Sequence, residues 1–345
     1  MFFCHSLKSL LFNANKTVNI FQYFTLICLF IIIGARMSSS KKYPDTLEGF
    51  GYGFNDEGKL RKIDEKTKKV GNEPFQFQIS SKHAENQEHY EAIGEVITEE
   101  VYKLLEAKGL YRLYVPDDIP KEEASFVFST KEKLDNPKKL MVLIHGSGVV
   151  RAGQWARSLI INDCLNAGTQ LPYIERAVKE NYEVLIMNTN LNSVMKDGKR
   201  KDIKGSETPT KHADTVWKKF VIDSNPESVA IVAHSYGGVV TVDLANRYPT
   251  FFKEKVFAVG FTDSVHYHNV PQYLQEISRN WVTSSEPLDT PMKTRTNDVP
   301  CFSAGHNKHE YTSWSCIQAL FKFFATQYEK HTDLENPSKK VKTDL

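Results

Sequence analysis

The chain has 345 residues, of which 41% are apolar and 25% are charged, which suits one large soluble domain with an extension. The formal net charge of +2 gives no compositional reason to expect direct nucleic-acid binding. Three widely spaced cysteines lie beyond the N-terminal segment, Cys164, Cys301 and Cys316. Their number and spacing argue against a disulfide framework and a cysteine zinc site. The sequence as a whole implies no metal or organic cofactor.

The chain opens with an apolar run, Ile20–Ala35, that follows two lysines. Its core is shorter than the roughly 20 residues of a spanning helix. Residues 1–36 therefore predict a secretory signal or an anchor segment, and we expect no stable membrane span in the mature form. Met37 follows directly, and a second start there would give a form without the signal. Residues 37–42 are polar and predict a disordered linker.

The periodicity of the remaining chain predicts one domain over residues 43–328. Tyr43–Phe77 is glycine-rich, with a hairpin expected near Phe54–Gly58, and the polar stretch Asn190–His212 predicts a surface loop. Apolar runs predict strands at Leu110–Val115, Ser125–Phe128, Leu140–Ile144, Tyr182–Asn188, Ser228–Ala233, Lys255–Thr262, Trp281–Ser284 and Pro300–Ala304. Helices are expected at His89–Ala107, Ile174–Glu180, Ala213–Ile222, Val239–Arg247 and Ser315–Tyr328.

Strand and helix alternate from Leu140 to the end of the domain. That alternation is typical of an α/β fold in which a mostly parallel sheet carries helices on both faces. We expect an α/β-hydrolase-like core over residues 140–325, preceded by an N-terminal extension.

The chain ends in a polar tail, residues 329–345. Its last four residues, Lys342-Thr343-Asp344-Leu345, resemble the K-D-E-L retrieval signal with one substitution. Together with the signal-like segment, this predicts the endoplasmic reticulum lumen. Starting at Met37 instead predicts a nuclear and cytoplasmic protein, and the only glycosylation sequon, Asn15-Lys16-Thr17, lies upstream of that start.

The strongest chemical signal is the run from Val229 to Gly238, VAIVAHSYGG, in which an apolar strand leads into Ser235 and then a helix. It matches the nucleophile elbow G-x-S-x-G, with Ala233 in place of the first glycine. The turn needs small residues two positions before and two after the serine, because side chains there would meet neighbouring backbone. Ser235 is therefore the candidate nucleophile. The alternative interpretation is an ordinary strand-turn-helix junction in which the serine caps the helix.

A second signal precedes it by one strand-helix-strand unit. The strand Leu140–Ile144 runs into His145-Gly146-Ser147-Gly148, where hydrolases of this type place the loop that binds the oxyanion. One N–H donor would come from Tyr236, directly after the nucleophile. The other would come from Ser147 or Gly148.

The general base and the acid are expected later in the chain, in the order Ser, Asp or Glu, His. His309 is preferred as the base because more loop residues allow it to reach back over the serine, and His306 remains an alternative. Asp263 closes the strand Lys255–Thr262, which suits a buried carboxylate that orients an imidazole. Asp289 follows the next strand, the commoner place of the acid in this fold, so both stay open.

Several longer runs carry a more specific resemblance: LMVLIHGSGVVRAGQWARSLIIND, VAHSYGG, TDSVH, NWVTSSEPLDT and SAGHNKHEYTSW. Together they resemble the Argonaute-binding-protein-two domain family, of the animal cotranscriptional regulator type, from about Tyr43 to Tyr328. The resemblance implies an α/β-hydrolase-like fold and nuclear work with Argonaute proteins and chromatin or splicing factors, in small-RNA-directed heterochromatin silencing or splicing regulation. By position, Ser235 matches the nucleophile and His309 the histidine before Glu-x-Thr-Ser-Trp.

Two functions follow. The first is a nuclear regulatory protein whose hydrolase-like fold binds partner proteins and does not catalyse a reaction. The second is a serine hydrolase of esterase type that attacks an acyl substrate, with Ser235, His309 and either Asp263 or Asp289 as its triad.

Overall fold

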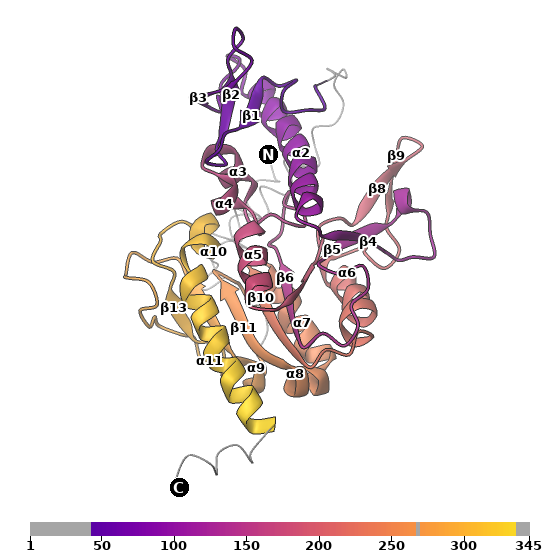
Figure 1. The fold of residues 1–345 in the computed structure, drawn as a ribbon, viewed down its shortest axis with the longest axis vertical. Coiled ribbons are helices and arrows are strands. Elements are labelled where there is room, and N and C mark those ends of the chain that lie inside the picture. The colour runs from indigo at the N-terminus through magenta and orange to yellow at the C-terminus, as the bar shows by residue number, and fades with distance from the viewer. Residues whose placement is uncertain (1–42, 267–269, 336–345) are drawn as a thin grey trace, which may run out of the picture. The chain divides into compact units, whose positions relative to one another are not determined.

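The computed structural model describes residues 43–266 and 270–335 (Figure 1). The predicted signal segment at 1–36, the linker at 37–42 and the KDEL-like end lie outside the described residues. The described residues from Pro44 onward form one compact unit.

A small antiparallel sheet and a long helix precede the main sheet (Figure 1). The small sheet joins β1 (Tyr52–Phe54), β2 (Leu60–Ile63) and β3 (Val70–Pro74) in that order. Asn55 makes the turn between β1 and β2, where its Oδ1 accepts from the N–H groups of Glu57 and Lys59. The predicted hairpin therefore lies where the glycine and asparagine signals placed it.

The main sheet has eight strands in the order β13-β12-β11-β10-β6-β7-β5-β4. The six from β13 to β7 run parallel, and β5 pairs antiparallel with both β7 and β4. Their bounds are β4 Tyr111–Val115, β5 Ser125–Ser129, β6 Lys139–Ile144, β7 Glu183–Ile186, β10 Ser228–His234, β11 Val256–Thr262, β12 Ser278–Val282 and β13 Cys301–Ser303.

This strand order is that of the α/β-hydrolase fold, as the sequence predicted. It reverses direction at β6: the chain goes from β6 to its neighbour β7 on one side, then crosses to β10 on the other side. In open sheets of this kind, ligands bind at such a switch point, beyond the carboxyl ends of the strands. The loops after β6 and β10 therefore meet where chemistry is expected.

Helices cover both faces of the sheet (Figure 1). Side chains alternate along β6, so Met141 and Leu143 join the core with α5 and α11, whereas Val142 and Ile144 join the core with α6, α7 and α8. The helices are α2 His83–Ala107, α3 Arg157–Asn162, α4 Leu165–Gly168, α5 Leu171–Lys179, α6 Pro209–Val216, α7 Gly237–Arg247, α8 Pro249–Lys255, α9 Gln272–Glu276, α10 Thr312–Ser315 and α11 Ile317–Glu335, with 3₁₀ turns at Lys121–Glu123 and His309–Tyr311 and a π-helical segment at Trp217–Ile222.

Two expectations need correction. The segment Asn190–His212 is not only a surface loop, because it contains the hairpin of β8 (Ser193–Lys196) and β9 (Lys199–Asp202) and ends at a fully buried His212. The short strands carry so many charged side chains that their pattern resembles a loop. The last helix, α11, also continues into the segment expected as polar tail, as far as Glu335.

Candidate active site

Ser235 lies in the turn between β10 and α7, half-buried, with a backbone φ of 54°. A serine rarely adopts this left-handed conformation, and neighbouring backbone holds it here. The Ser235 N–H donates to the Thr262 carbonyl (3.1 Å), and the Ser235 carbonyl accepts from the Val265 N–H (3.2 Å). The strand-turn-helix junction thus has the conformation of a nucleophile elbow.

The residues two positions before and after Ser235 are small because larger side chains would clash with neighbouring atoms, as the sequence suggested. A Cβ atom on Gly237 would lie 2.7 Å from the Ile144 carbonyl oxygen and 3.3 Å from the Cβ of Ala233. Ala233 itself is fully buried. The start of α7 therefore packs directly onto the end of β6, and this contact fixes the height of Ser235 above the sheet.

His309 and Asp263 come together beside the elbow. His309 Nδ1 lies 2.6 Å from Asp263 Oδ2, and the other carboxylate oxygen accepts from the N–H of Thr283 (3.1 Å). Since a carboxylate accepts, Nδ1 carries the proton and Nε2 of the neutral ring is left as a base. The His309 ring also packs on the ring of His234, with centroids 4.6 Å apart. Thr283 and His234 are members of the site that the sequence analysis missed.

The structure places the two alternative residues elsewhere. Asp289 Oδ1 accepts from the indole N–H of Trp281 (3.0 Å) and contacts Arg279 (3.5 Å). His306 stacks on Tyr311, with ring centroids 4.4 Å apart, and accepts from the N–H of Lys308. Neither therefore takes part in the pair that His309 makes with Asp263.

Two further histidines beneath the site stay neutral. Burial lowers the pKa of His234 to about 3 and that of His145 to about 4. His234 Nδ1 lies 2.8 Å from the Thr262 carbonyl, and His145 Nδ1 lies 2.8 Å from the Gly146 carbonyl. Carbonyls only accept, so both rings donate from Nδ1.

The loop after β6 lies against the serine. A Cβ atom on Gly146 would come within 3.0 Å of the Ser235 Cβ, so a larger residue here would push the loop and the serine apart. Ser147 and Gly148 are exposed, and Gly148 has a φ of 98°. Tyr236 directly precedes α7. The three expected oxyanion residues thus border Ser235 from the two loops that the strand order brings together.

No hydrogen bond joins the Ser235 hydroxyl to His309 within the described part of the chain. Such a contact is often open in the absence of substrate and closes when substrate binds. Ser235, Asp263 and His309 thus follow the chain order of a serine hydrolase centre, and the contact between His309 and Asp263 is formed.

We compared the chain with known protein families. The Arb2 domain model matches residues 43–288. The chain belongs to the Arb2 domain family. It is 41% identical to the cotranscriptional regulator ARB2A of Mus musculus, across 86% of this chain and 84% of that protein. It is also 38% identical to a FAM172 family protein homolog of Caenorhabditis elegans, across 82% of this chain and 87% of that protein.

Solved structures are more distant from this Arb2 chain. A histone deacetylase from Saccharomyces cerevisiae aligns with 68% of this chain and 97% of its own, at 12% identity and a TM-score of 0.45. That similarity is too low to carry a functional argument, so the fold assignment rests on the strand order itself.

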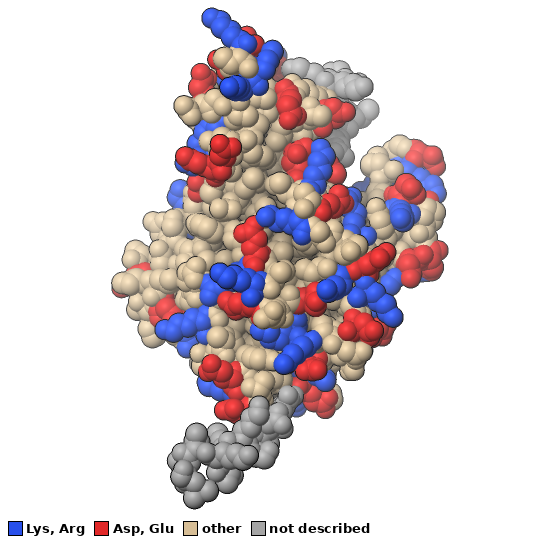
Figure 2. Space-filling view, viewed as in Figure 1, with Lys and Arg blue, Asp and Glu red and all other residues tan. Residues whose placement is uncertain are grey.

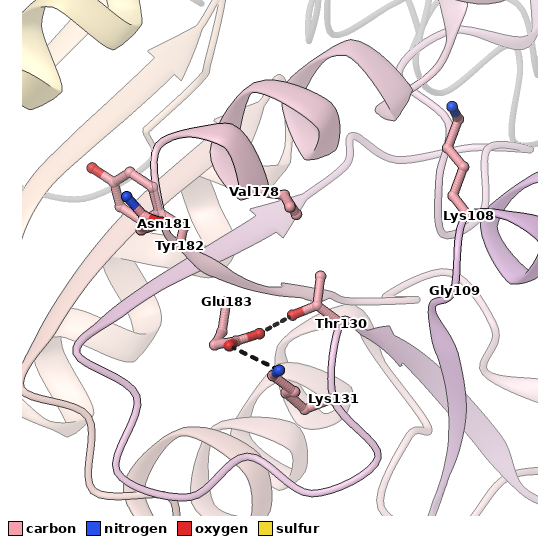
Figure 3. A pocket seen from close by; sticks show the side chains of 8 residues that line it. All are labelled: Lys108, Gly109, Thr130, Lys131, Val178, Asn181, Tyr182 and Glu183. Atoms are coloured by element: carbon pink, nitrogen blue, oxygen red, sulfur yellow. Dashed lines mark hydrogen bonds and ion pairs between the residues drawn. The ribbon is translucent and has the colours of Figure 1, made fainter.

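A separate pocket of about 340 Å³ opens at the other end of the parallel strands of the Arb2 domain (Figure 3). Glu183 begins β7 there, bonds to Thr130 and pairs with Lys131 (3.6 Å), while Lys108 pairs with Glu175 (2.6 Å). The two lysines of this pocket are thus already paired with carboxylates. The pocket lies at the end of the strands opposite to Ser235.

The described residues contain no group of three or more His, Cys, Asp or Glu side chains placed to hold a metal ion. Within the same residues, no helix has both the length and the apolarity to cross a membrane. On the face shown in Figure 2, basic and acidic side chains are interspersed.

Proposed function

We propose that this protein is a nuclear cotranscriptional regulator that works with Argonaute proteins in small-RNA-directed heterochromatin silencing or in splicing. The observation that carries the proposal is the 41% identity to a cotranscriptional regulator across 84% of that relative's length. The form that starts at Met37 would be the nuclear one.

Affinity purification of the tagged Met37 form from nuclear extract, with and without ribonuclease, tests this role. Recovery of an Argonaute protein with chromatin or splicing factors is the expected result. Absence of all three classes from extracts in which the bait is well folded would contradict the proposal. Ser235→Ala serves as the matched variant, because a role that needs no chemistry predicts the same partners.

A second candidate function is acyl hydrolysis, and a specific observation favours it. Ser235 occupies a strained elbow at φ 54°, and His309 Nδ1 lies 2.6 Å from Asp263. A regulatory scaffold has no need of either feature, whereas a serine nucleophile needs both.

The reaction would follow from these groups. The Ser235 Oγ attacks the carbonyl carbon of an ester or another acyl substrate and passes its proton to His309 Nε2. The tetrahedral intermediate expels its leaving group, which takes that proton, and a water molecule then hydrolyses the acyl-serine by the same route. The Asp263 carboxylate stabilises the imidazolium that forms in each half-reaction.

Labelling with a fluorophosphonate probe tests the chemistry, since the probe phosphonylates only activated serines. Wild-type protein should label, and Ser235→Ala should not. In His309→Ala we expect labelling to slow by roughly 10⁴-fold, the usual loss for a triad member. A folded wild-type protein that does not label would remove the hydrolase candidate and leave the regulatory role alone.

A further inference from the structure

The loop Gly146–Val150 is held from beneath through its carbonyl groups. Asn190 Nδ2 donates to the carbonyl of Gly146 (2.9 Å) and to that of Val150 (3.0 Å), so one side-chain amide spans both ends of the loop. Arg151 Nη1 adds contacts to the carbonyls of Val149 (3.2 Å) and Val150 (3.1 Å). The carbonyls of this loop are thus largely engaged by side chains of the same chain.

The direction of one carbonyl decides the direction of the next N–H. In a trans peptide the C=O of one residue and the N–H of the following residue point to opposite sides. The only cis peptide of the described residues is Val115–Pro116. Because the Gly146 carbonyl points toward Asn190, the Ser147 N–H points away from Asn190.

The same loop borders the nucleophile, as the 3.0 Å approach of a Gly146 Cβ to Ser235 shows. We infer that Asn190 is a positioning residue, which together with His145 Nδ1 (2.8 Å) holds the Gly146 carbonyl so that the Ser147 N–H becomes the second donor to the oxyanion. This inference rests on the proposed hydrolase function, and it chooses Ser147 over Gly148 as the partner of the Tyr236 N–H.

The chemistry of the side chain explains why an amide is needed. Asn190 Nδ2 carries two N–H donors, and each of the two carbonyls takes one. Aspartate has nearly the same shape but carries acceptors only, so it would face both carbonyls with lone pairs and repel them. Asn190→Asp therefore reverses the sign of the contact with little change in volume.

Asn192 provides a matched control in the same loop. Its Nδ2 also donates to two carbonyls, those of Thr189 (2.9 Å) and Ser206 (2.7 Å), and it is half-buried like Asn190. It has no hydrogen bond to residues 146–150. Asn192→Asp thus imposes the same chemical change without touching the oxyanion loop.

The experiment measures fluorophosphonate labelling of the full chain as a function of probe concentration, which separates probe affinity from the rate of bond formation. Asn190→Asp should slow bond formation roughly tenfold to a hundredfold at unchanged probe affinity, as misplaced oxyanion donors do. Asn192→Asp should label like wild type. Hydrogen exchange of the 145–151 amides should accelerate in Asn190→Asp and not in Asn192→Asp. If Asn190→Asp does not fold, Asn190→Ser, which is too short to reach both carbonyls, carries the same expectation.

The outcomes separate the two claims. Equal bond-forming rates in Asn190→Asp and wild type would overturn the positioning role and leave the hydrolase standing. Equal slowing in both aspartate variants would also overturn it, because the loss would then be general. A folded wild-type protein without labelling would overturn the hydrolase function, and the positioning role with it.

Discussion

At the residue scale, two strained backbone positions define the candidate centre. Ser235 has a φ of 54° and Asp263 a φ of 46°, and each directly follows the strand that carries it. Non-glycine residues in this region cost about 1–3 kcal/mol each and persist where neighbouring structure enforces them. Here each of the two residues helps to hold the other, since the backbone of Ser235 forms hydrogen bonds with Thr262 and Val265, which flank Asp263.

The identity of the acid gives a prediction at this scale. Asp263→Asn should slow fluorophosphonate labelling by roughly 10³–10⁴-fold, because a neutral amide neither fixes the tautomer of His309 nor stabilises its imidazolium. Asp289→Asn should leave labelling unchanged, since Asp289 bonds to Trp281 and Arg279 instead. The pair is read from initial labelling rates, and a loss confined to Asp289→Asn would reverse the assignment.

The sequence alone named Ser235, His309 and Asp263, since each ends or follows a recognisable strand. It left Asp289 and His306 open, because the choice depends on how two loops fold toward each other. It missed His234 as a packing partner of His309, although that residue adjoins the serine, because a strand-end histidine has no distinctive pattern. Asn190 was likewise hidden in a stretch whose polarity resembled a solvated loop.

At the element scale, the long helix α2 is joined to α3 through a buried arginine. The Arg157 side chain is 4% exposed, and its guanidinium packs onto Gly94 of α2 and pairs with Glu95 at 3.3 Å. A Cβ on Gly94 would lie 2.6 Å from the Arg157 Cζ. The glycine is therefore what allows the two helices to enclose this charge.

Gly94→Ala should lower the free energy of unfolding by about 1–2 kcal/mol, because displacing a buried guanidinium outweighs the roughly 1 kcal/mol that alanine gains over glycine within a helix. Urea unfolding measures this, with Glu91→Ala on the exposed side of α2 as the control that should change stability by less than about 0.5 kcal/mol.

Combination with Arg157→Met identifies the cause. If the clash is with the guanidinium, the double variant should lose less stability than the sum of the two single variants. Strict additivity would show that the cost of Gly94→Ala lies elsewhere in α2.

The element pattern was predictable where apolar runs were long and not where charge dominated. The strands of the parallel sheet are buried on both faces, so they appear as continuous apolar runs such as LMVLI in β6. In β8 and β9 the side chains are half-buried or exposed, and Lys196 and Lys201 both pair with Glu123. The turn between them is Asp197-Gly198, with φ of 51° and 71°, so the signal for this hairpin was its turn and not the periodicity of its strands.

At the scale of the whole molecule, three buried histidines make stability depend on pH. Burial lowers the pKa of His145 to about 4 and those of His212 and His234 to about 3, from an ordinary value near 6.5. At pH values between the folded and the unfolded pKa, these histidines bind protons in the unfolded chain but not in the folded chain. Stability is therefore complete above about pH 6.5 and falls as the pH drops toward 4.

Urea unfolding at pH 7, 6 and 5 should show this fall, at up to about 1.4 kcal/mol per pH unit for each histidine. Other groups contribute to the total slope, so a variant isolates one histidine. His212→Gln should reduce the dependence of the unfolding free energy on pH by the contribution of one histidine. Substitution of the exposed His83 should leave this dependence unchanged. Identical slopes in wild type and His212→Gln would contradict the assignment.

The turn that follows β11 has a consequence for how this centre can move. The turn carries the carboxylate of Asp263, and it and the last residue of β11 supply two backbone contacts of Ser235, so the candidate acid and the candidate nucleophile are held by the same segment. A shift of the sheet edge would carry the two together and leave their separation unchanged. His309 comes from another loop and is 47% exposed on its side chain. Of the three groups, the imidazole of His309 is therefore the one that comes from outside the segment that holds the other two.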